Sequence, residues 1–259
     1  MFLFIVLSTV AAYAAGDATY LMYENRWDKG VVIVFVIAGS INTYGTGFWV
    51  SENILVTARH VVFPNGLQPD RISIIKGSWS STAEILYEDE LTDVAVLRVN
   101  SMPDEYFIFQ LDLSVEKGDE IIVVGYPWQV VYLVDYNLEV ASLYPRANWG
   151  KITWIHPINN YVIEFSAGTD QGNSGGPVID VQSGGVVGLV SFALDEAGVE
   201  YSTFYLTSSS EIKSALEDLG VSYSIANPIP IPHTYFWPLV GVGALLMLIL
   251  VFIFVVRKK

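Results

Sequence analysis

The sequence from Val31 to Val190 is a succession of short apolar runs, each ended by turn-forming residues such as glycine, proline, asparagine or aspartate. Runs that are rich in β-branched and aromatic residues and bounded in this way are typical of β-strands. The plainest candidates are VVIVFVIAG, GTGFWVSENILVTA, DVAVLRV, DEIIVVGYP, NYVIEFSAG and GGVVGLVSFA. No long stretch here has the period of an amphipathic helix. The pattern therefore predicts an all-β sandwich or a pair of barrels.

One helix is predicted after these strands. Ser208 and Glu211 have the S-x-x-E spacing of a capping box, which marks a helix N-terminus. Gly220 suits the position just beyond a helix C-terminus. The apolar residues between them recur at i, i+3, i+4 and i+7, and they are Ile212, Ala215, Leu216 and Leu219.

Composition restricts the chemistry. The chain has 259 residues and no cysteine, so disulfides, thiolate metal sites and cysteine nucleophiles are excluded. Only three histidines are present, which disfavours a multi-histidine metal site. The 27 acidic residues outnumber the 13 basic ones, and phosphate binding depends on lysine and arginine. We therefore expect no metal ion and no nucleic-acid partner.

Both ends of the sequence carry apolar segments. Residues 1–15 are apolar and contain an A-x-A pattern at 12–14, which is typical of a signal peptide cleavage site. An uncleaved anchor is the alternative for this segment, because it has no basic side chain near its start. Residues 236–256 are uncharged and about as long as the ~20 residues that a transmembrane helix requires. A buried core helix is the alternative for this second segment.

Charge sets the expected orientation. The basic residues of the tail at 257–259 favour the cytoplasmic side, which places the bulk of the chain outside the cell membrane. The sequence thus predicts a proline-rich linker over 226–233, a transmembrane helix over 234–256 and a cytoplasmic tail over 257–259. We expect a single-pass membrane protein, anchored through this C-terminal helix.

A glycine-rich stretch, GTDQGNSGGPVID, surrounds Ser174. Glycine costs roughly 0.5–1 kcal/mol relative to alanine inside a regular element, so clustered glycines mark a backbone with special demands. A turn that aims several N–H groups at one point is one such demand, and a plain loop is the alternative. The stretch also satisfies G-x-S-x-G, but the α/β-hydrolase motif needs a helix after the serine and a catalytic histidine downstream. Strand-like residues follow here, and the only downstream histidine is His233 in the linker.

The opposite order of residues fits a catalytic triad. A serine nucleophile needs a base within hydrogen-bond reach, because its hydroxyl is a weak nucleophile at neutral pH. His60 lies in ILVTARHVV, at the end of an apolar strand, and Asp93 lies in LTDVAVLRV, just before another. The order His, Asp, Ser is one of the known arrangements of the triad. His156 has no comparable context and is expected to be structural.

The stretches GTGFWVSENILVTARHVV, TDVAVLRV and GNSGGPV together resemble the chymotrypsin-fold, trypsin-like serine proteases over roughly residues 25–220. The absence of cysteine and the asparagine in GNSGGP are similar to the HtrA/Deg type. This resemblance implies two six-stranded antiparallel β-barrels with the active site between them. We expect a protease domain over 16–225, with barrels at about 20–105 and about 106–220.

The resemblance also implies a role for each motif residue. Ser174 would attack the scissile carbonyl, His60 would transfer the proton, and Asp93 would orient the imidazole. The backbone N–H groups of Gly172 and Ser174 would form the oxyanion hole, with Asn173 assisting. Each such donor is worth on the order of 10²–10³ in rate.

The sequence departs from the family pattern in two places. Trypsin-like zymogens carry an aspartate before the serine that pairs with a new N-terminus, whereas this chain has Asn173, so no such activation is expected. HtrA-type proteins usually carry PDZ domains after the protease, and here we expect none. The oligomeric state stays open.

Substrate contacts are predicted from the same resemblance. Gly168 corresponds to the base of the S1 pocket and Asp170 to its rim. Val190, Ser191, Phe192 and Ala193 resemble the strand that pairs with the substrate backbone. Because Gly168 is not an acid, we expect apolar or small P1 side chains rather than lysine or arginine.

The sequence therefore predicts a membrane-anchored, outward-facing serine endopeptidase that acts on polypeptides and uses no metal ion or organic cofactor. One alternative is a catalytically silent member of the same fold that binds peptides by strand addition. An esterase with the same triad is another. The apolar segment over 127–140 is predicted as either strands or a lid.

Overall fold

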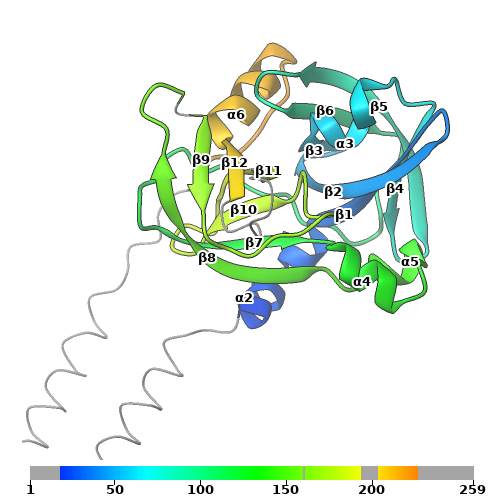
Figure 1. The fold of residues 1–259 in the computed structure, drawn as a ribbon, viewed down its shortest axis with the longest axis horizontal. Coiled ribbons are helices and arrows are strands. Elements are labelled where there is room, and N and C mark those ends of the chain that lie inside the picture. Colours follow the sequence, from blue (N-terminus) through cyan, green and yellow to red (C-terminus); the bar gives the residue numbers. More distant parts are fainter. Residues whose placement is uncertain (1–17, 160, 194–203, 227–259) are drawn as a thin grey trace, which may run out of the picture. The chain divides into compact units, whose positions relative to one another are not determined.

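Figure 1 shows the computed structural model, in which residues 18–159, 161–193 and 204–226 are described. Within these ranges twelve strands form two closed barrels of six antiparallel strands each. The predicted signal peptide, transmembrane helix and cytoplasmic tail lie outside the described residues. None of the helices in the described ranges has the length and apolar character needed to cross a membrane.

The first barrel has the strand order β1-β2-β3-β6-β5-β4. Residues 54–58 of β3 are buried along their whole length, which explains why the sequence there is a continuous apolar run. In β5 half-buried and exposed residues predominate, so this strand carries no such run. The six strands are β1 (Val31–Ala38), β2 (Ile41–Ser51), β3 (Ile54–Ala58), β4 (Arg71–Lys76), β5 (Trp79–Asp89) and β6 (Val94–Val99).

The second barrel has the strand order β10-β11-β12-β9-β8-β7. Its interior is a separate apolar cluster that includes Ile121, Ile163, Phe165 and Val187. The six strands are β7 (Glu120–Gly125), β8 (Arg146–Ile155), β9 (Val162–Phe165), β10 (Pro177–Asp180), β11 (Val186–Ala193) and β12 (Phe204–Ser208). The prediction of two six-stranded antiparallel barrels is confirmed.

The predicted C-terminal helix is confirmed as α6 (Ser209–Asp218). The Ser208 side chain accepts a hydrogen bond from the Ser210 N–H (3.3 Å), so Ser208 caps the helix as expected. The reciprocal half of the capping box is not formed, because the Ser208 N–H is used in the sheet, where it donates to the Tyr161 C=O. Gly220 ends the helix with φ +65°.

The remaining helices are short. The segment over 127–140, predicted as strands or a lid, forms two of them between β7 and β8, at the edge where the barrels meet (Figure 1). They are α4 (Trp128–Leu133) and α5 (Leu138–Ala141). The others are α2 (Ala18–Glu24), η1 (Trp27–Lys29), α3 (Arg59–Val62) and η2 (Pro64–Gly66).

Candidate active site

His60 is positioned by a one-turn helix, α3, that begins where β3 ends. The Arg59 N–H donates to the Asp93 C=O (2.9 Å), and the His60 N–H donates to Asp93 Oδ1 (2.9 Å). The imidazole Nδ1 lies 2.8 Å from Asp93 Oδ2. A carboxylate at Nδ1 favours the tautomer that carries its proton there, and this leaves Nε2 free to accept a proton. The pair is thus arranged for general-base chemistry.

Asp93 itself sits in the tight turn that leads into β6. Its φ is +57°, a left-handed conformation that aspartate tolerates better than most residues. The Ser191 hydroxyl of β11 donates to Asp93 Oδ2 (2.6 Å). Burial alone would raise the pKa of Asp93, but its hydrogen bonds with His60 and Ser191 and the proximity of the imidazole hold the pKa below its usual value. The carboxylate is therefore ionised at neutral pH.

Ser174 lies in a turn whose backbone requires glycine both before and after the serine. Gly172 has φ +95° and Gly175 has φ +81°. A Cβ on Gly172 would come within 2.2 Å of the Tyr126 C=O, and one on Gly175 within 2.3 Å of the Thr46 C=O. The glycine cluster around Ser174 is explained by these two close approaches and the left-handed backbone, rather than by a plain loop.

The orientation of the Gly172 N–H is fixed by a hydrogen bond to the carbonyl group of its own peptide unit. The Gln171 C=O, in the same peptide unit, accepts a hydrogen bond from the Trp128 N–H at the start of α4 (2.8 Å). The C=O and N–H of a trans peptide point in opposite directions. The Gly172 N–H therefore points away from α4, and it has no hydrogen-bond partner among the described residues.

The Ser174 N–H is held in the same way. The Asn173 C=O of its peptide unit accepts from the Gly176 N–H (2.8 Å). The Asn173 N–H differs, because it donates to the Asp170 C=O (3.0 Å). Of the three predicted oxyanion-hole groups, those of Gly172 and Ser174 are the two without a partner in the described part of the chain.

Thr46, a residue of β2 in the first barrel, is hydrogen-bonded to this turn. Its N–H donates to the Ser174 C=O (2.9 Å), and its hydroxyl donates to the Gly172 C=O (2.7 Å). The same hydroxyl accepts from the Tyr126 N–H (3.1 Å). Thr46 is fully buried, so these bonds are shielded from water. No sequence motif marks Thr46 for this role.

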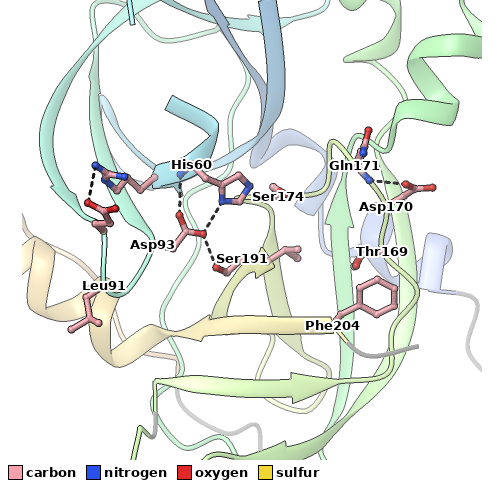
Figure 2. Close-up of a pocket in the computed structure, with 12 residues that line it drawn as sticks. His60, Leu91, Asp93, Thr169, Asp170, Gln171, Ser174, Ser191 and Phe204 are labelled. Atoms are coloured by element: carbon pink, nitrogen blue, oxygen red, sulfur yellow. Dashed lines mark hydrogen bonds and ion pairs between the residues drawn. The ribbon is translucent and has the colours of Figure 1, made fainter. Parts of the chain in front are cut away.

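The three predicted triad residues line one cavity of about 650 Å³. Figure 2 shows His60, Asp93 and Ser174 together on its wall, with Ser191 beside Asp93 and Phe204 across from them. The other lining residues are Arg59, Glu90, Leu91, Thr169, Asp170, Gln171 and Val190. A nucleophile, a base and the group that orients the base therefore face one space.

Of the predicted substrate-binding residues, Asp170, Val190 and Ser191 line this cavity. Asp170 lines it, and its carboxylate accepts hydrogen bonds from the Gln171 N–H and from the Gln129 side chain. Gly168 lines a second cavity of about 440 Å³, which Asp170 also borders. Ser191 uses its hydroxyl to hold Asp93. Residues 192–193 are the last two of β11.

The apolar wall of the cavity includes one residue, Phe204, that the sequence did not indicate. Phe204 at the start of β12 and Val190 of β11 both line it. Phe204 lies in no motif, so nothing in the sequence indicated that it would line the cavity. Val190 is the first residue of the predicted substrate strand.

Family comparison covers the central part of the chain. The family model described as the trypsin-like peptidase domain matches residues 45–189. The serine protease Rv3671c of Mycobacterium tuberculosis is 25% identical over 189 residues, which is 70% of this chain and 43% of that protein. A probable periplasmic serine endoprotease, DegP-like, of Brucella suis is 28% identical over 179 residues, which is 68% of this chain and 32% of that protein. The chain thus spans less than half the length of these relatives.

Solved structures share the architecture. The active form of the Rv3671c protease from M. tuberculosis has a TM-score of 0.60 at 23% identity, covering 79% of this chain and 86% of that one. The serine endoprotease from Yersinia pestis has a TM-score of 0.61 at 20% identity, covering 78% of this chain and 66% of that one. At these identities the likeness shows the fold.

Proposed function

The chain belongs to the trypsin-like peptidase family of serine proteases, and we propose that it is an active, membrane-anchored endopeptidase that cleaves exported polypeptides through an acyl-enzyme. One observation carries the proposal. His60 Nδ1 lies 2.8 Å from an ionised Asp93 while His60 and Ser174 line the same cavity. A silent peptide-binding protein of this fold has no need for a base that is held and oriented in this way.

Each catalytic group has a defined part in the proposed reaction. Ser174 Oγ attacks the scissile carbonyl carbon while His60 Nε2 takes the hydroxyl proton. Asp93 stays ionised and stabilises the imidazolium. The oxyanion is stabilised by the N–H groups of Gly172 and Ser174, each worth on the order of 10²–10³ in rate. His60 then protonates the leaving amine, and water releases the acyl group by the reverse sequence of proton transfers.

The cavity lining supports a preference for apolar or small P1 side chains. Val190 and Phe204 supply an apolar wall to the triad cavity, and Gly168, which lines the second cavity, carries no charge. The Asp170 carboxylate is already bonded to the Gln129 side chain and the Gln171 N–H, which leaves it poorly placed to pair with a cationic P1 residue. A P1-varied peptide library tests this preference, and fastest cleavage after arginine would contradict it.

The location of the enzyme is part of the proposal. The uncharged stretch over 236–256, followed by the three basic residues at 257–259, supports a single-pass anchor with the protease domain outside the membrane. In intact cells, added proteinase K should then degrade the protease domain of the chain. Protection of this domain until the membrane is permeabilised would refute the orientation.

An active-site probe tests the catalytic proposal directly. The full-length chain, embedded in membranes, is treated with a fluorophosphonate beside its Ser174→Ala and His60→Ala variants. Labelling of the parent that both substitutions abolish is the expected result, since the probe reacts only with an activated serine. A folded but unlabelled parent would favour the silent peptide-binding alternative. Turnover of esters with no cleavage of any peptide would favour the esterase.

A further inference from the structure

The segment that joins β7 to β8 exposes an unusual amount of apolar surface. Seven of the fifteen exposed large hydrophobic side chains of the described residues lie between positions 128 and 144. The exposed fraction is 55% for Tyr132, 69% for Leu133 and 67% for Tyr136. Single exposed apolar residues are common on soluble proteins, but a cluster of this kind marks an interaction surface.

Three aromatic rings in this segment form a continuous row. Trp128 and Tyr132 lie four residues apart on α4, and their ring centroids are 5.7 Å apart. The centroids of Tyr132 and Tyr136 are 6.0 Å apart. Asp135 and Tyr136 have φ values of +52° and +60°, and this left-handed turn carries the chain back so that the third ring joins the row. We call Trp128, Tyr132 and Tyr136 the aromatic row.

The aromatic row begins at the edge of the catalytic cavity. The Trp128 N–H donates to the Gln171 C=O (2.8 Å), and the Gln129 side chain donates to the Asp170 carboxylate. Asp170 and Gln171 both line the cavity that holds the triad. The segment that carries the aromatic row therefore contacts two residues of the cavity wall.

The direction of a bound peptide follows from the neighbours of Ser174. On one side the Gly175 N–H donates to the Val190 C=O of β11 (2.7 Å), and on the other the Thr46 N–H of β2 donates to the Ser174 C=O (2.9 Å). If the acyl half of a substrate lies along β11, the leaving-group half must pass toward β2. A peptide that runs along this path leaves the cavity on the side of β2.

Tyr44 connects this exit to the aromatic row. Its ring packs against Gly172, because a Cβ on that glycine would lie 2.8 Å from Tyr44 Cε2. Burial, with the nearby Asp170 and Tyr136, raises the pKa of Tyr44 to about 12. Tyr44 therefore packs against the same oxyanion turn to which Trp128, the first ring of the row, is hydrogen-bonded.

We propose that the aromatic row is an exosite for the leaving-group half of the polypeptide substrate, and this inference rests on the proposed endopeptidase activity. The exosite takes extended segments with apolar or aromatic side chains, which pack against exposed rings. Residues 127–145 contain two acidic residues and no basic one, so acidic segments are repelled. The row therefore adds selectivity on the side of the scissile bond opposite to P1.

Peptide kinetics with the full-length chain in nanodiscs of zwitterionic lipid test the exosite. Two internally quenched peptides share the residues before the scissile bond, and after it one carries tyrosine and leucine where the other carries serine. We expect kcat/KM to be about tenfold higher for the aromatic peptide, mainly through KM, as one or two aromatic contacts would give. Tyr132→Ser should reduce this preference to within about twofold. Ile158→Ser, at a more exposed position between β8 and β9, should leave it unchanged.

A binding measurement separates failure of the exosite from failure of catalysis. In the Ser174→Ala background the labelled aromatic peptide should bind about tenfold more tightly than the serine peptide, and Tyr132→Ser should remove the difference. This result supports the exosite even if the parent proves inactive toward peptides. Equal affinity for both peptides, or a preference that survives Tyr132→Ser, overturns it.

Discussion

The proposed catalytic site has an acid–base half, which is His60 and Asp93, and an oxyanion half, which is the turn from Gly172 to Ser174. The two halves are held by different kinds of hydrogen bonds. In the acid–base half, the Asp93 carboxylate accepts from the His60 N–H and from the Ser191 hydroxyl, and it pairs with the imidazole. These bonds converge on one ionised side chain. Hydrogen bonds to a charged group are the stronger ones, so this half is fixed by side-chain electrostatics.

The oxyanion half is held through the backbone. Thr46 and the Trp128 N–H donate hydrogen bonds to carbonyl groups of the turn. The N–H groups of Gly172 and Ser174 have no partner among the described residues and are available to the oxyanion. Two buried side-chain atoms beside this turn, Tyr44 Oη and Asn173 Nδ2, have no partner among the described residues. A buried polar atom without a partner costs on the order of 1–3 kcal/mol. Within the described residues, the polar groups of the oxyanion half are therefore less fully hydrogen-bonded than those of the acid–base half.

This difference predicts different kinetic signatures. Damage to the acid–base half should change proton transfer and its pH dependence. Damage to the oxyanion half should lower kcat while leaving the pH dependence in place, because only the position of the N–H donors changes.

Asp93→Asn should have the largest effect. An amide in place of the carboxylate cannot stabilise the imidazolium and favours the wrong tautomer of His60, so kcat should fall by about 10⁴. Steady-state kinetics with one peptide substrate provide the measurement. Asp104→Asn, at an exposed position, is the matched control. A loss smaller than tenfold would show that Asp93 does not orient the base.

Thr46→Val should have the second largest effect. Valine keeps the shape of threonine but removes the hydroxyl that holds the Gly172 C=O. A displacement of about 1 Å in a catalytic group can cost about 10² in rate, so we expect kcat to fall about 10²-fold with an unaltered pH profile.

The conservative variant Thr46→Ser separates this role from folding. Serine retains the hydroxyl, so Thr46→Ser should recover most of kcat. Thermal unfolding of both variants reports on stability independently. If Thr46→Val retains kcat, the hydroxyl is only structural and the backbone N–H alone holds the turn.

The sequence predicted the triad because each member lies in a short local pattern. A strand followed by TARH, a turn followed by an apolar strand, and a glycine cluster are all visible without the fold. The strands were predicted for the same reason, since buried strands are continuous apolar runs. Their closure into two six-stranded barrels was implied by the family resemblance. Strands such as β5, which lies largely at the surface, lack this signal.

The remaining parts of the site depend on contacts between distant segments. Thr46 and Ser174 are far apart in the sequence, and only the packing of the two barrels brings them together. The role of Ser191 toward Asp93 likewise crosses from β11 to the start of β6. Short apolar helices such as α4 cannot be told from strands by periodicity, which is why residues 127–140 were left open.

Ser191→Ala should have a smaller effect and should act on the acid–base half alone. The substitution removes one hydrogen bond from the Asp93 carboxylate, so the pKa of Asp93 should rise toward its usual value. A depressed carboxylate pKa adds stability at neutral pH that is lost as the pH falls through the acid range. The extra stability of the parent over Ser191→Ala should therefore be present above about pH 4 and disappear below it.

Two measurements test this expectation. Urea unfolding of the parent and of Ser191→Ala between pH 2 and pH 7 gives the difference in the free energy of unfolding. Peptide hydrolysis at pH 7 should show a loss of about tenfold or less. A stability difference that is constant over this pH range would mean that the hydroxyl does not act through the carboxylate charge.

Lys76→Met should have the smallest effect on catalysis, because Lys76 reaches the oxyanion half only through a chain of contacts. Its ammonium group donates to the Tyr126 hydroxyl (2.9 Å) and to the Asp28 C=O, and the Tyr126 N–H donates to Thr46. Burial lowers the pKa of Lys76 to about 8, although the negative charge of Asp28 acts to raise it. We expect kcat at pH 7 to change by about twofold or less, since the Thr46 contacts to the turn remain.

The effect of Lys76 on stability should nevertheless depend on pH with a defined sign. Between pH 8 and about 10.5 the folded chain releases the Lys76 proton while the unfolded chain keeps it, so the free energy of unfolding rises with pH. The rise is at most about 3 kcal/mol, at about 1.4 kcal/mol for each unit of pKa difference. Lys76→Met removes the titrating group, so the parent should gain stability relative to the variant over this interval. Parallel unfolding curves for parent and variant would show that the ammonium is solvated, and the link from Lys76 to the oxyanion half would then be absent.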